Sequence, residues 1–168
     1  MKAVILAAGE GARLQPLTES RPKPMLPVGN RPLLEHVVEA VIEAGIDDIV
    51  LVVGYRRERI QSYFGDGDAW GVDIEYAVQE KQLGTGHAVL QAEGHVHGPF
   101  IALNGDRIVG ADDIASVVNS LKETGETTLA VARAERPSEY GVVSLEGDTV
   151  IDIVEKPPRH ATPSDIVN

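Results

Sequence analysis

A glycine-rich segment with a basic residue follows the first apolar run of the chain. It reads Gly9-Glu10-Gly11-Ala12-Arg13-Leu14. Glycines allow backbone N–H groups to close around a phosphate chain, and the Arg13 guanidinium adds a forked cation. The pattern is not a dinucleotide-binding fingerprint, because Leu14 occupies the third glycine position, and it is not a P-loop, because no Gly-Lys-Ser/Thr follows. The segment predicts an anion site, with a tight structural turn as the alternative.

Lys23 stands between Pro22 and Pro24. The two prolines keep the backbone around Lys23 extended and out of a helix, so its ammonium group is a candidate phosphate ligand. Residues 13–31 hold four basic side chains against one acidic side chain, a local charge of +3 in a chain whose net charge is −11. A basic island in an acidic protein indicates a specific anion site. The alternative for Lys23 is a solvated surface lysine.

Apolar runs and helical patterns alternate along the chain and predict the elements that position these residues. They predict strands at 2–7, 49–53, 72–78, 100–103, 127–132, 142–145 and 150–154, and helices at 33–42, 57–64, 85–93 and 114–122. Five of the ten prolines fall between residues 16 and 32, so residues 9–31 are expected to form a long ordered loop. Loops of this length in compact domains are usually functional.

Repeated strand–helix units predict a mainly parallel, doubly wound sheet. Ligands of such sheets bind at the carboxyl ends of the strands. Three motifs lie just past predicted strand ends, at residues 9–23, 79–85 and 104–106. The order of the elements therefore predicts that these three motifs meet at one edge of the sheet.

The motifs together resemble a known signature. Residues 6–18 read Leu-Ala-Ala-Gly-Glu-Gly-Ala-Arg-Leu-Gln-Pro-Leu-Thr, and residues 21–28 read Arg-Pro-Lys-Pro-Met-Leu-Pro-Val. Both segments closely resemble the sugar-1-phosphate nucleotidylyltransferases, also called nucleotide-sugar pyrophosphorylases. Residues 83–88 and 104–106 add further matches, and the resemblance covers nearly the whole chain. One departure is Ala12, which stands where the family usually has Thr or Ser.

The resemblance implies a fold and a set of site residues. The fold is a three-layer α/β/α, Rossmann-like nucleotidyltransferase fold with a mainly parallel mixed sheet. Arg13 and Lys23 would be catalytic, and Asp106 would hold a Mg²⁺ cofactor. The implied nucleotide-binding residues are Leu6, Ala8, Gly9, Gly11, Gln79, Gly84 and Thr85. The implied sugar-phosphate-binding residues are Gly141, Glu155, Lys156 and Asn168.

The reaction that the resemblance implies joins a nucleoside triphosphate to a sugar 1-phosphate and releases pyrophosphate. Gln79 would read the base, because its amide offers both a donor and an acceptor to a pyrimidine edge. UTP or dTTP is favoured, with glucose 1-phosphate or N-acetylglucosamine 1-phosphate as the acceptor. The alternatives are a mannose-1-phosphate guanylyltransferase and a nucleotide-binding module with little turnover.

Composition excludes several other classes. The chain has no cysteine, which excludes disulfides and thiol catalysis and favours a cytoplasmic location. No run of about 18 apolar residues exists, so no membrane span is expected. The net charge of −11 argues against binding to nucleic acid or to an anionic membrane surface. The excess acid fits either life in high salt, where repulsion is screened, or an ordinary acidic protein.

The length of 168 residues is enough for one domain with a sizeable core. The family's catalytic domain is longer, so residues 1–168 are expected to form a catalytic domain that lacks its C-terminal end. An uncovered sheet edge would favour pairing with a second copy, so a homo-oligomer is expected.

Overall fold

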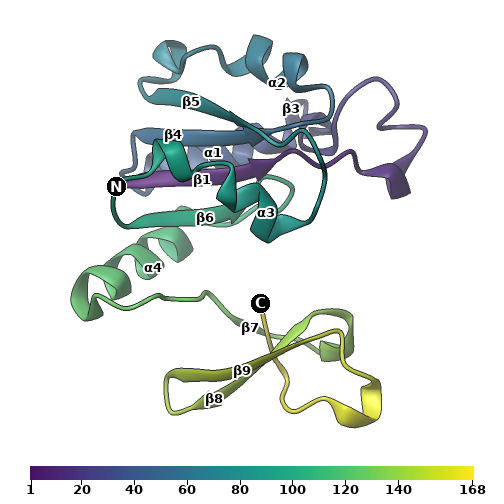
Figure 1. The fold of residues 1–168 in the computed structure, drawn as a ribbon, viewed down its shortest axis with the longest axis vertical. Helices are drawn as coiled ribbons and strands as arrows, with labels where there is room; N and C mark the ends of the chain where they lie inside the picture. Colours follow the sequence, from purple (N-terminus) through teal and green to yellow (C-terminus); the bar gives the residue numbers. More distant parts are fainter. The chain divides into compact units, whose positions relative to one another are not determined.

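The computed structural model describes all 168 residues, which fold into two compact units (Figure 1). The first unit is Met1–Val118 and the second is Asn119–Asn168. None of the helices combines the length and the apolar character needed to cross a bilayer.

The first unit is built on a parallel sheet of four strands. They are β1 (Lys2–Ala7), β4 (Asp48–Val53), β5 (Asp73–Val78) and β6 (Phe100–Asn104), in the order β5-β4-β1-β6. The four strands predicted at these positions are thus confirmed. The chain winds outward from β1 to β5 and then returns to place β6 on the other side of β1. Strand order therefore reverses at β1, where open α/β sheets bind ligands.

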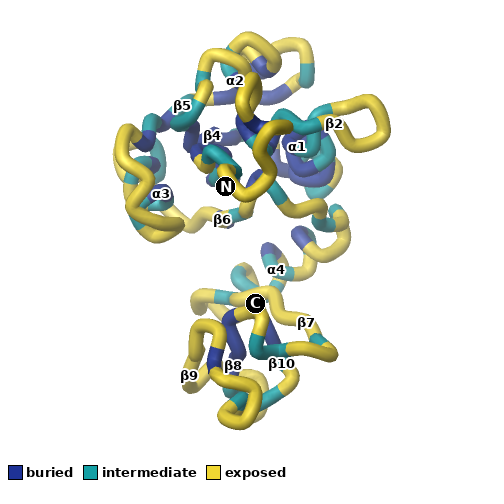
Figure 2. Tube along the Cα trace, turned by 90° about the vertical axis from the view of Figure 1, so that its right-hand side faces the viewer, coloured by how far each residue is buried: buried dark blue, intermediate teal, exposed yellow.

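Side chains alternate between the two faces of this sheet and give it two hydrophobic layers. Ile5, Ile49 and Leu51 are fully buried on the face covered by α1 (Leu33–Glu43) and α2 (Arg57–Phe64). Figure 2 shows the buried stretches of these elements in dark blue. The opposite face is covered by α3, which spans Thr85–Leu90. Its apolar layer is formed by Val4, Val50, Val52 and Ala77 with Ala88 of α3. The expected three-layer α/β/α arrangement is therefore confirmed.

Two of the predicted helices have different ends in the structure. The helix predicted at 85–93 ends at Leu90, because the next amides bond three residues back and tighten the chain into the 3-10 turn Glu93–His95. Helix α4 begins earlier than predicted and spans Ala111–Thr124, across the boundary of the two units.

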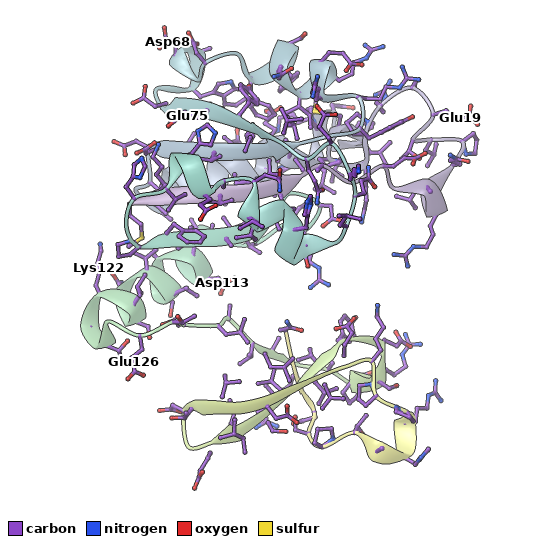
Figure 3. The ribbon with its side chains drawn as sticks, in the orientation of Figure 1. Glu19, Asp68, Glu75, Asp113, Lys122 and Glu126 are labelled. Atoms are coloured by element: carbon purple, nitrogen blue, oxygen red, sulfur yellow. The ribbon has the colours of Figure 1, made fainter.

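The predicted long loop contains only short regular pieces. They are the 3-10 turns Ala12–Leu14 and Lys23–Met25 and the two-residue strand β2 (Pro27–Val28), which pairs with β3 (Arg31–Pro32). Residues 10–22 are called the arm below. Figure 3 labels Glu19 in the arm, at the opposite end of the first unit from Glu75 on β5.

The second unit is an antiparallel sheet with the order β7-β10-β8-β9. The predicted hairpin is confirmed as β8 (Gly141–Glu146) and β9 (Thr149–Glu155). The prediction of a strand at 127–132 is wrong. Only Ala132–Arg133 pairs, as β7, because its neighbour β10 (Ile166–Val167) offers just two residues.

Candidate active site

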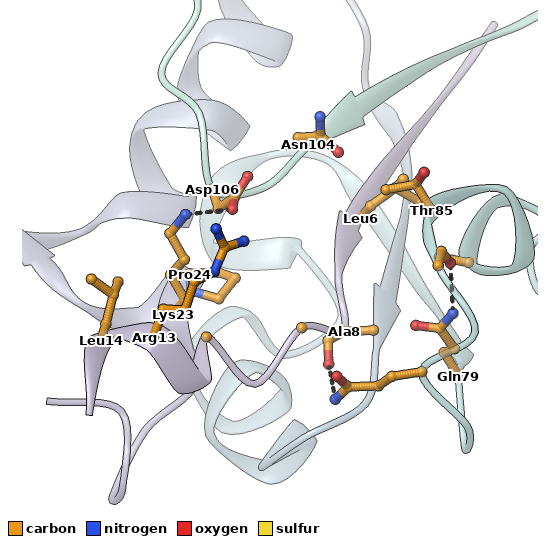
Figure 4. A pocket seen from close by; sticks show the side chains of 15 residues that line it. Leu6, Ala8, Arg13, Leu14, Lys23, Pro24, Gln79, Thr85, Asn104 and Asp106 are labelled. Carbon is orange, nitrogen blue, oxygen red and sulfur yellow. Dashed lines mark hydrogen bonds and ion pairs between the residues drawn. The ribbon is translucent and has the colours of Figure 1, made fainter. Parts of the chain in front are cut away.

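A pocket of about 620 Å³ opens at the carboxyl ends of β1, β5 and β6 (Figure 4). This volume lies in the range of small-molecule and cofactor sites. The pocket is lined by Leu6, Ala8, Gly9, Gly11, Arg13, Leu14, Lys23, Pro24, Gln79, Gln82, Gly84, Thr85, Ala88, Asn104 and Asp106. Every candidate site residue that precedes Gly141 is in this set. The structure therefore brings the three predicted motifs to one edge of the sheet.

Gly105 places Asp106 beside the end of β1. The Gly105 N–H donates to the Leu6 carbonyl at 2.9 Å. A Cβ at Gly105 would lie 3.0 Å from the same carbonyl oxygen and 3.0 Å from Cδ1 of Leu34. A residue with a side chain would push β6 away from β1, so this close approach favours glycine.

Gly11 brings the arm against Lys23. Its φ is +71°, in the left-handed region, and a Cβ there would lie 2.7 Å from Cβ of Lys23. The Thr18 hydroxyl donates to the Gly11 carbonyl at 3.1 Å. These contacts place the 3-10 turn that carries Arg13 on the same side of the pocket as Lys23.

Positive charge gathers at this end of the pocket. Lys23 Nζ lies 2.6 Å from Asp106 Oδ2, and both side chains keep about a third of their surface exposed. Arg13 makes no ion pair or side-chain hydrogen bond, and Figure 4 shows its guanidinium on the same side of the pocket as Lys23 and Asp106. This end has the charge that a phosphate chain requires.

The other end of the pocket presents an amide. Gln79 Nε2 donates to the Gly84 carbonyl at 3.1 Å and lies 3.0 Å from Nδ1 of His87. A carbonyl can only accept, so the first contact fixes the amide orientation, and the second then uses the other N–H with Nδ1 as the acceptor. Figure 4 marks the hydrogen bond of the Gln79 amide nitrogen with a dashed line and shows the amide oxygen turned away from that bond.

Gln79 therefore differs in one respect from the sequence-based expectation. It was expected to offer both a donor and an acceptor, but both of its donors are used within the protein. Gln79 is only 4% exposed, and its Oε1 has no hydrogen-bond partner in the protein. Because no fully buried side-chain polar atom lacks a partner, Oε1 must keep some exposed surface, and Gln79 lines the pocket. The group left for a ligand is an acceptor.

Gln82 is a lining residue that sequence reasoning missed. Its Nε2 donates to the Ala8 carbonyl at 3.2 Å and so ties the loop after β5 to the loop after β1. His87, which orients Gln79, was also not predicted as a site residue. Gln82 lies within the motif at 79–85 and His87 within the matching segment 83–88, and these positions were the available signal.

The candidate sugar-side residues lie together in the second unit. Gly141 pairs with Glu155 across the hairpin, and the Asn168 N–H donates to the Gly141 carbonyl at 3.1 Å. A side chain at Gly141 would collide with the Asn168 amide oxygen and lie 3.2 Å from Glu155 Oε2. Lys156 follows with its Nζ 3.2 Å from Glu155 Oε1. Two acceptor groups thus flank a position where only glycine leaves room.

The carboxylates of the pocket limit how a metal ion could be held. No group of three or more His, Asp or Glu side chains is placed to bind a metal. Asp106 is the one carboxylate that lines the pocket. Mg²⁺ is commonly held by one or two carboxylates together with substrate phosphates and water. The residues present fit a Mg²⁺ ion that brings phosphate oxygens with it.

Comparison with known proteins agrees with this geometry. The sequence pattern of the nucleotidyl transferase family matches residues 2–168. The chain belongs to the nucleotidyl transferase family. A protein of this family from Methanococcus maripaludis, named bifunctional protein GlmU, is 43% identical over the whole chain. The chain spans only 38% of the length of that relative.

This chain spans about 70% of the length of two other similar proteins. A Haloferax volcanii protein named UTP--glucose-1-phosphate uridylyltransferase AglF is 36% identical over 99% of the chain and 69% of its own length. The crystal structure of a UDP-glucose pyrophosphorylase complexed with UDP-glucose matches with a TM-score of 0.87 and 26% identity. That match covers 99% of this chain and 72% of the other. The resemblance to sugar-1-phosphate nucleotidylyltransferases is confirmed.

Proposed function

We propose that this chain transfers a nucleotidyl group from a nucleoside triphosphate to a sugar 1-phosphate. The observation that carries this proposal is a single pocket with a cationic end, at Arg13 and Lys23, and an amide end, at Gln79. A nucleoside triphosphate has the matching division, because its phosphates are anionic and its base offers hydrogen-bonding edges. Membership of the family and the names of the relatives support the same activity.

In this reaction an oxygen of the sugar phosphate attacks the α-phosphorus. The bond from the α-phosphorus to the bridging oxygen breaks, and pyrophosphate leaves with the electron pair. The attacking phosphate has a second pKa of about 6, so it is mostly ionised at neutral pH and needs no general base. Catalysis then depends on positioning and on neutralising charge. Arg13 and Lys23 are the cations available for the triphosphate.

We include Mg²⁺ as the cofactor and Asp106 as its protein ligand. When bound, the ion would neutralise charge on the triphosphate and on the departing pyrophosphate. Asp106 can offer its Oδ1 while Lys23 keeps its contact with Oδ2, or it can offer both oxygens once Lys23 turns to a phosphate.

The favoured nucleotides are UTP and dTTP. Uracil and thymine carry an N–H between two carbonyls, and Gln79 Oε1 is an acceptor that such an N–H can reach. Guanine also carries a ring N–H, which keeps GTP with mannose 1-phosphate as the alternative. For the sugar, the acceptors of Glu155 and Asn168 suit hexose hydroxyls, and Lys156 suits the phosphate of glucose 1-phosphate or N-acetylglucosamine 1-phosphate.

The test is pyrophosphate release from a panel of triphosphates and sugar 1-phosphates with Mg²⁺. We expect release with UTP or dTTP and with a glucose-type sugar phosphate. Release only with GTP and mannose 1-phosphate would favour the guanylyltransferase. Binding of nucleotide without any release would favour a binding module. Homo-oligomeric assembly stays a prediction, which light scattering of the same preparation would check.

A further inference from the structure

Few hydrogen bonds attach the arm to the rest of the molecule. Within the arm, amide hydrogen bonds run from Leu14 to Gly11 at 2.8 Å and from Leu17 to Leu14 at 2.9 Å. From outside the arm, the Met25 N–H donates to the Pro22 carbonyl at 2.9 Å, and the side chains that bond to residues 10–22 are those of Tyr55 and Arg56. The placement of Arg13 therefore depends on contacts made by a different loop.

Tyr55 and Arg56 bind two consecutive carbonyls of the arm. The Tyr55 hydroxyl lies 3.2 Å from the Thr18 carbonyl oxygen and 3.1 Å from that of Glu19, so its one hydrogen is shared between them. Arg56 Nη2 donates to the Glu19 carbonyl at 2.9 Å. Arg56 has a φ of +53°, which is uncommon for a residue with a side chain. Such conformations persist where surrounding contacts determine them, and here the guanidinium contact is one of these.

Thr18 connects the bonded carbonyls of the arm to the pocket residue Gly11. Thr18 is only 1% exposed, and its hydroxyl donates to the Gly11 carbonyl at 3.1 Å. A Cβ at Gly11 would lie 3.3 Å from Cγ2 of Thr18 and 2.7 Å from Cβ of Lys23. Tyr55 thus contacts Thr18, Thr18 contacts Gly11, and Gly11 packs closely against Lys23. A shift of Thr18 would move the backbone that precedes Arg13 and faces Lys23.

The loop that bears Tyr55 is itself held by the strand ends. The Tyr55 N–H donates to the Ala8 carbonyl at 3.2 Å. A Cβ at Gly54 would lie 2.9 Å from the Ala8 carbonyl oxygen and 3.0 Å from that of Gln79. The loop therefore has a fixed position between β1 and β5, and it can hold the arm against a rigid sheet.

We propose that Tyr55 and Arg56 are positioning residues for nucleotidyl transfer: they hold the arm so that Arg13 and Lys23 face the triphosphate. Neither residue lines the pocket, so neither is expected to touch the substrate. Donors that are already in place need no reorganisation when charge develops. The proposal rests on the proposed function for its purpose, but the attachment itself can be measured without any substrate.

The test compares Tyr55→Phe with Tyr63→Phe. The Tyr63 hydroxyl binds Glu35 of α1, outside the pocket, so this control loses a tyrosine hydroxyl of the same unit without touching the arm. The first readout is backbone amide exchange of residues 10–22 without ligand. We expect faster exchange in Tyr55→Phe and unchanged exchange in Tyr63→Phe.

The second readout is calorimetric binding of inorganic tripolyphosphate and of uridine. Loss of one hydrogen bond that orders the arm should weaken tripolyphosphate about threefold to tenfold. Uridine affinity should stay within about twofold, because Gln79 is oriented by Gly84 and His87 and not by the arm. This division between phosphate and base would not follow from a general loss of stability.

The outcomes separate the two proposals. Unchanged exchange of residues 10–22 in Tyr55→Phe, or equally faster exchange in both variants, overturns the positioning role. A wild-type chain that binds no tripolyphosphate overturns the proposed function, whereas the exchange result still decides whether Tyr55 holds the arm. If Tyr55→Phe fails to fold, Arg56→Ala takes its place, because Arg56 is exposed and its side chain also binds the arm.

Discussion

Lys23 and Asp106 form an ion pair 2.6 Å long at one end of the pocket, although they lie 83 positions apart in the sequence. Lys23 follows the arm, and Asp106 follows β6. In the proposed reaction each has another partner, because Lys23 is needed by the phosphates and Asp106 by Mg²⁺. In the free pocket, Asp106 therefore neutralises the charge of Lys23, whereas Arg13 has no ion-pair partner. In the proposed reaction the pair would also link the binding of the metal to the binding of the triphosphate, since either ligand would share or replace this contact.

Replacing Lys23 tests its phosphate role. Lys23→Ala should lower turnover by more than about tenfold, equivalent to about 1.4 kcal/mol of transition-state stabilisation. The measurement is steady-state pyrophosphate release, with circular dichroism to verify the fold. Lys122→Ala, on α4 and without an ion pair, is the matched control. Wild-type turnover in a folded Lys23→Ala protein would rule out the phosphate role.

Asp106→Asn should have opposite effects with and without metal. Without metal, nucleotide should bind more tightly, because Lys23 no longer shares its charge with a carboxylate. With Mg²⁺, the gain in affinity that the metal gives the wild-type protein should disappear, since an amide is a poorer ligand than a carboxylate. Calorimetry of UTP binding with Mg²⁺ and with EDTA measures both. Loss of affinity under both conditions would contradict the assignment of Asp106 as a metal ligand.

Substitutions of Gln79 and His87 should weaken recognition of the base and leave binding of the phosphates unchanged. Gln79→Ala should weaken UTP by about 1 kcal/mol, or about fivefold, and leave pyrophosphate binding unchanged. His87→Ala leaves one N–H of a buried amide without its acceptor, so it should lower the preference for UTP over CTP. The control is His97→Ala, an exposed histidine outside the pocket. Equal losses for UTP and pyrophosphate in Gln79→Ala would contradict base reading.

The sequence predicted the sheet of the first unit well because its elements are set by local patterns. Ile49–Val53 is a continuous apolar run, and Gly45 stands just past the end of α1 as a stop signal. The strand predicted at 127–132 failed because apolar residues alone cannot make a strand. Leu129 and Val131 are apolar but remain exposed, and pairing stops where β10 ends.

The candidate site was predictable as a set of residues but not as a set of contacts. Gln79 was identifiable from its motif, whereas the direction of its amide depends on the Gly84 carbonyl and His87 after folding. Tyr55 and Arg56 carry no motif of their own, and they meet Thr18 and Glu19 only because β4 lies next to β1. Contacts between distant segments of this kind depend on the register of the sheet, which no local pattern shows.

Salt should stabilise the folded chain. Its net charge is −11, with 26 acidic against 15 basic side chains, so repulsion among surface carboxylates opposes folding in dilute buffer. At 1 M ionic strength the screening length falls to about 3 Å and this repulsion is largely removed. The melting temperature should rise from dilute buffer to molar KCl. A flat or falling melting temperature would remove the high-salt interpretation of the composition.

Glu75 gives a prediction for acid stability. Hydrogen bonds from Lys2 and then from His95 lower the pKa of this carboxyl below its ordinary value of 4.5. A carboxyl whose pKa is lower in the folded state stabilises the fold above the unfolded-state pKa, and this stabilisation is lost as the pH falls through the folded-state value. Glu75→Gln should therefore be less stable than the wild-type protein at pH 7, and the difference should shrink to zero in acid. Because the carboxylate is 45% exposed, we expect a difference of at most about 1 kcal/mol at pH 7.

The measurement is urea unfolding of Glu75→Gln and the wild-type protein between pH 7 and pH 3. Glu123→Gln, an exposed residue of α4 without an ion pair, is the control and should match the wild-type protein throughout. The network of Glu75 with Lys2 and His95 lies outside the pocket, so UTP binding at pH 7 should not change. A difference in unfolding free energy that does not become smaller as the pH falls from 7 to 3 would show that the substitution acts through packing and not through the charge of Glu75.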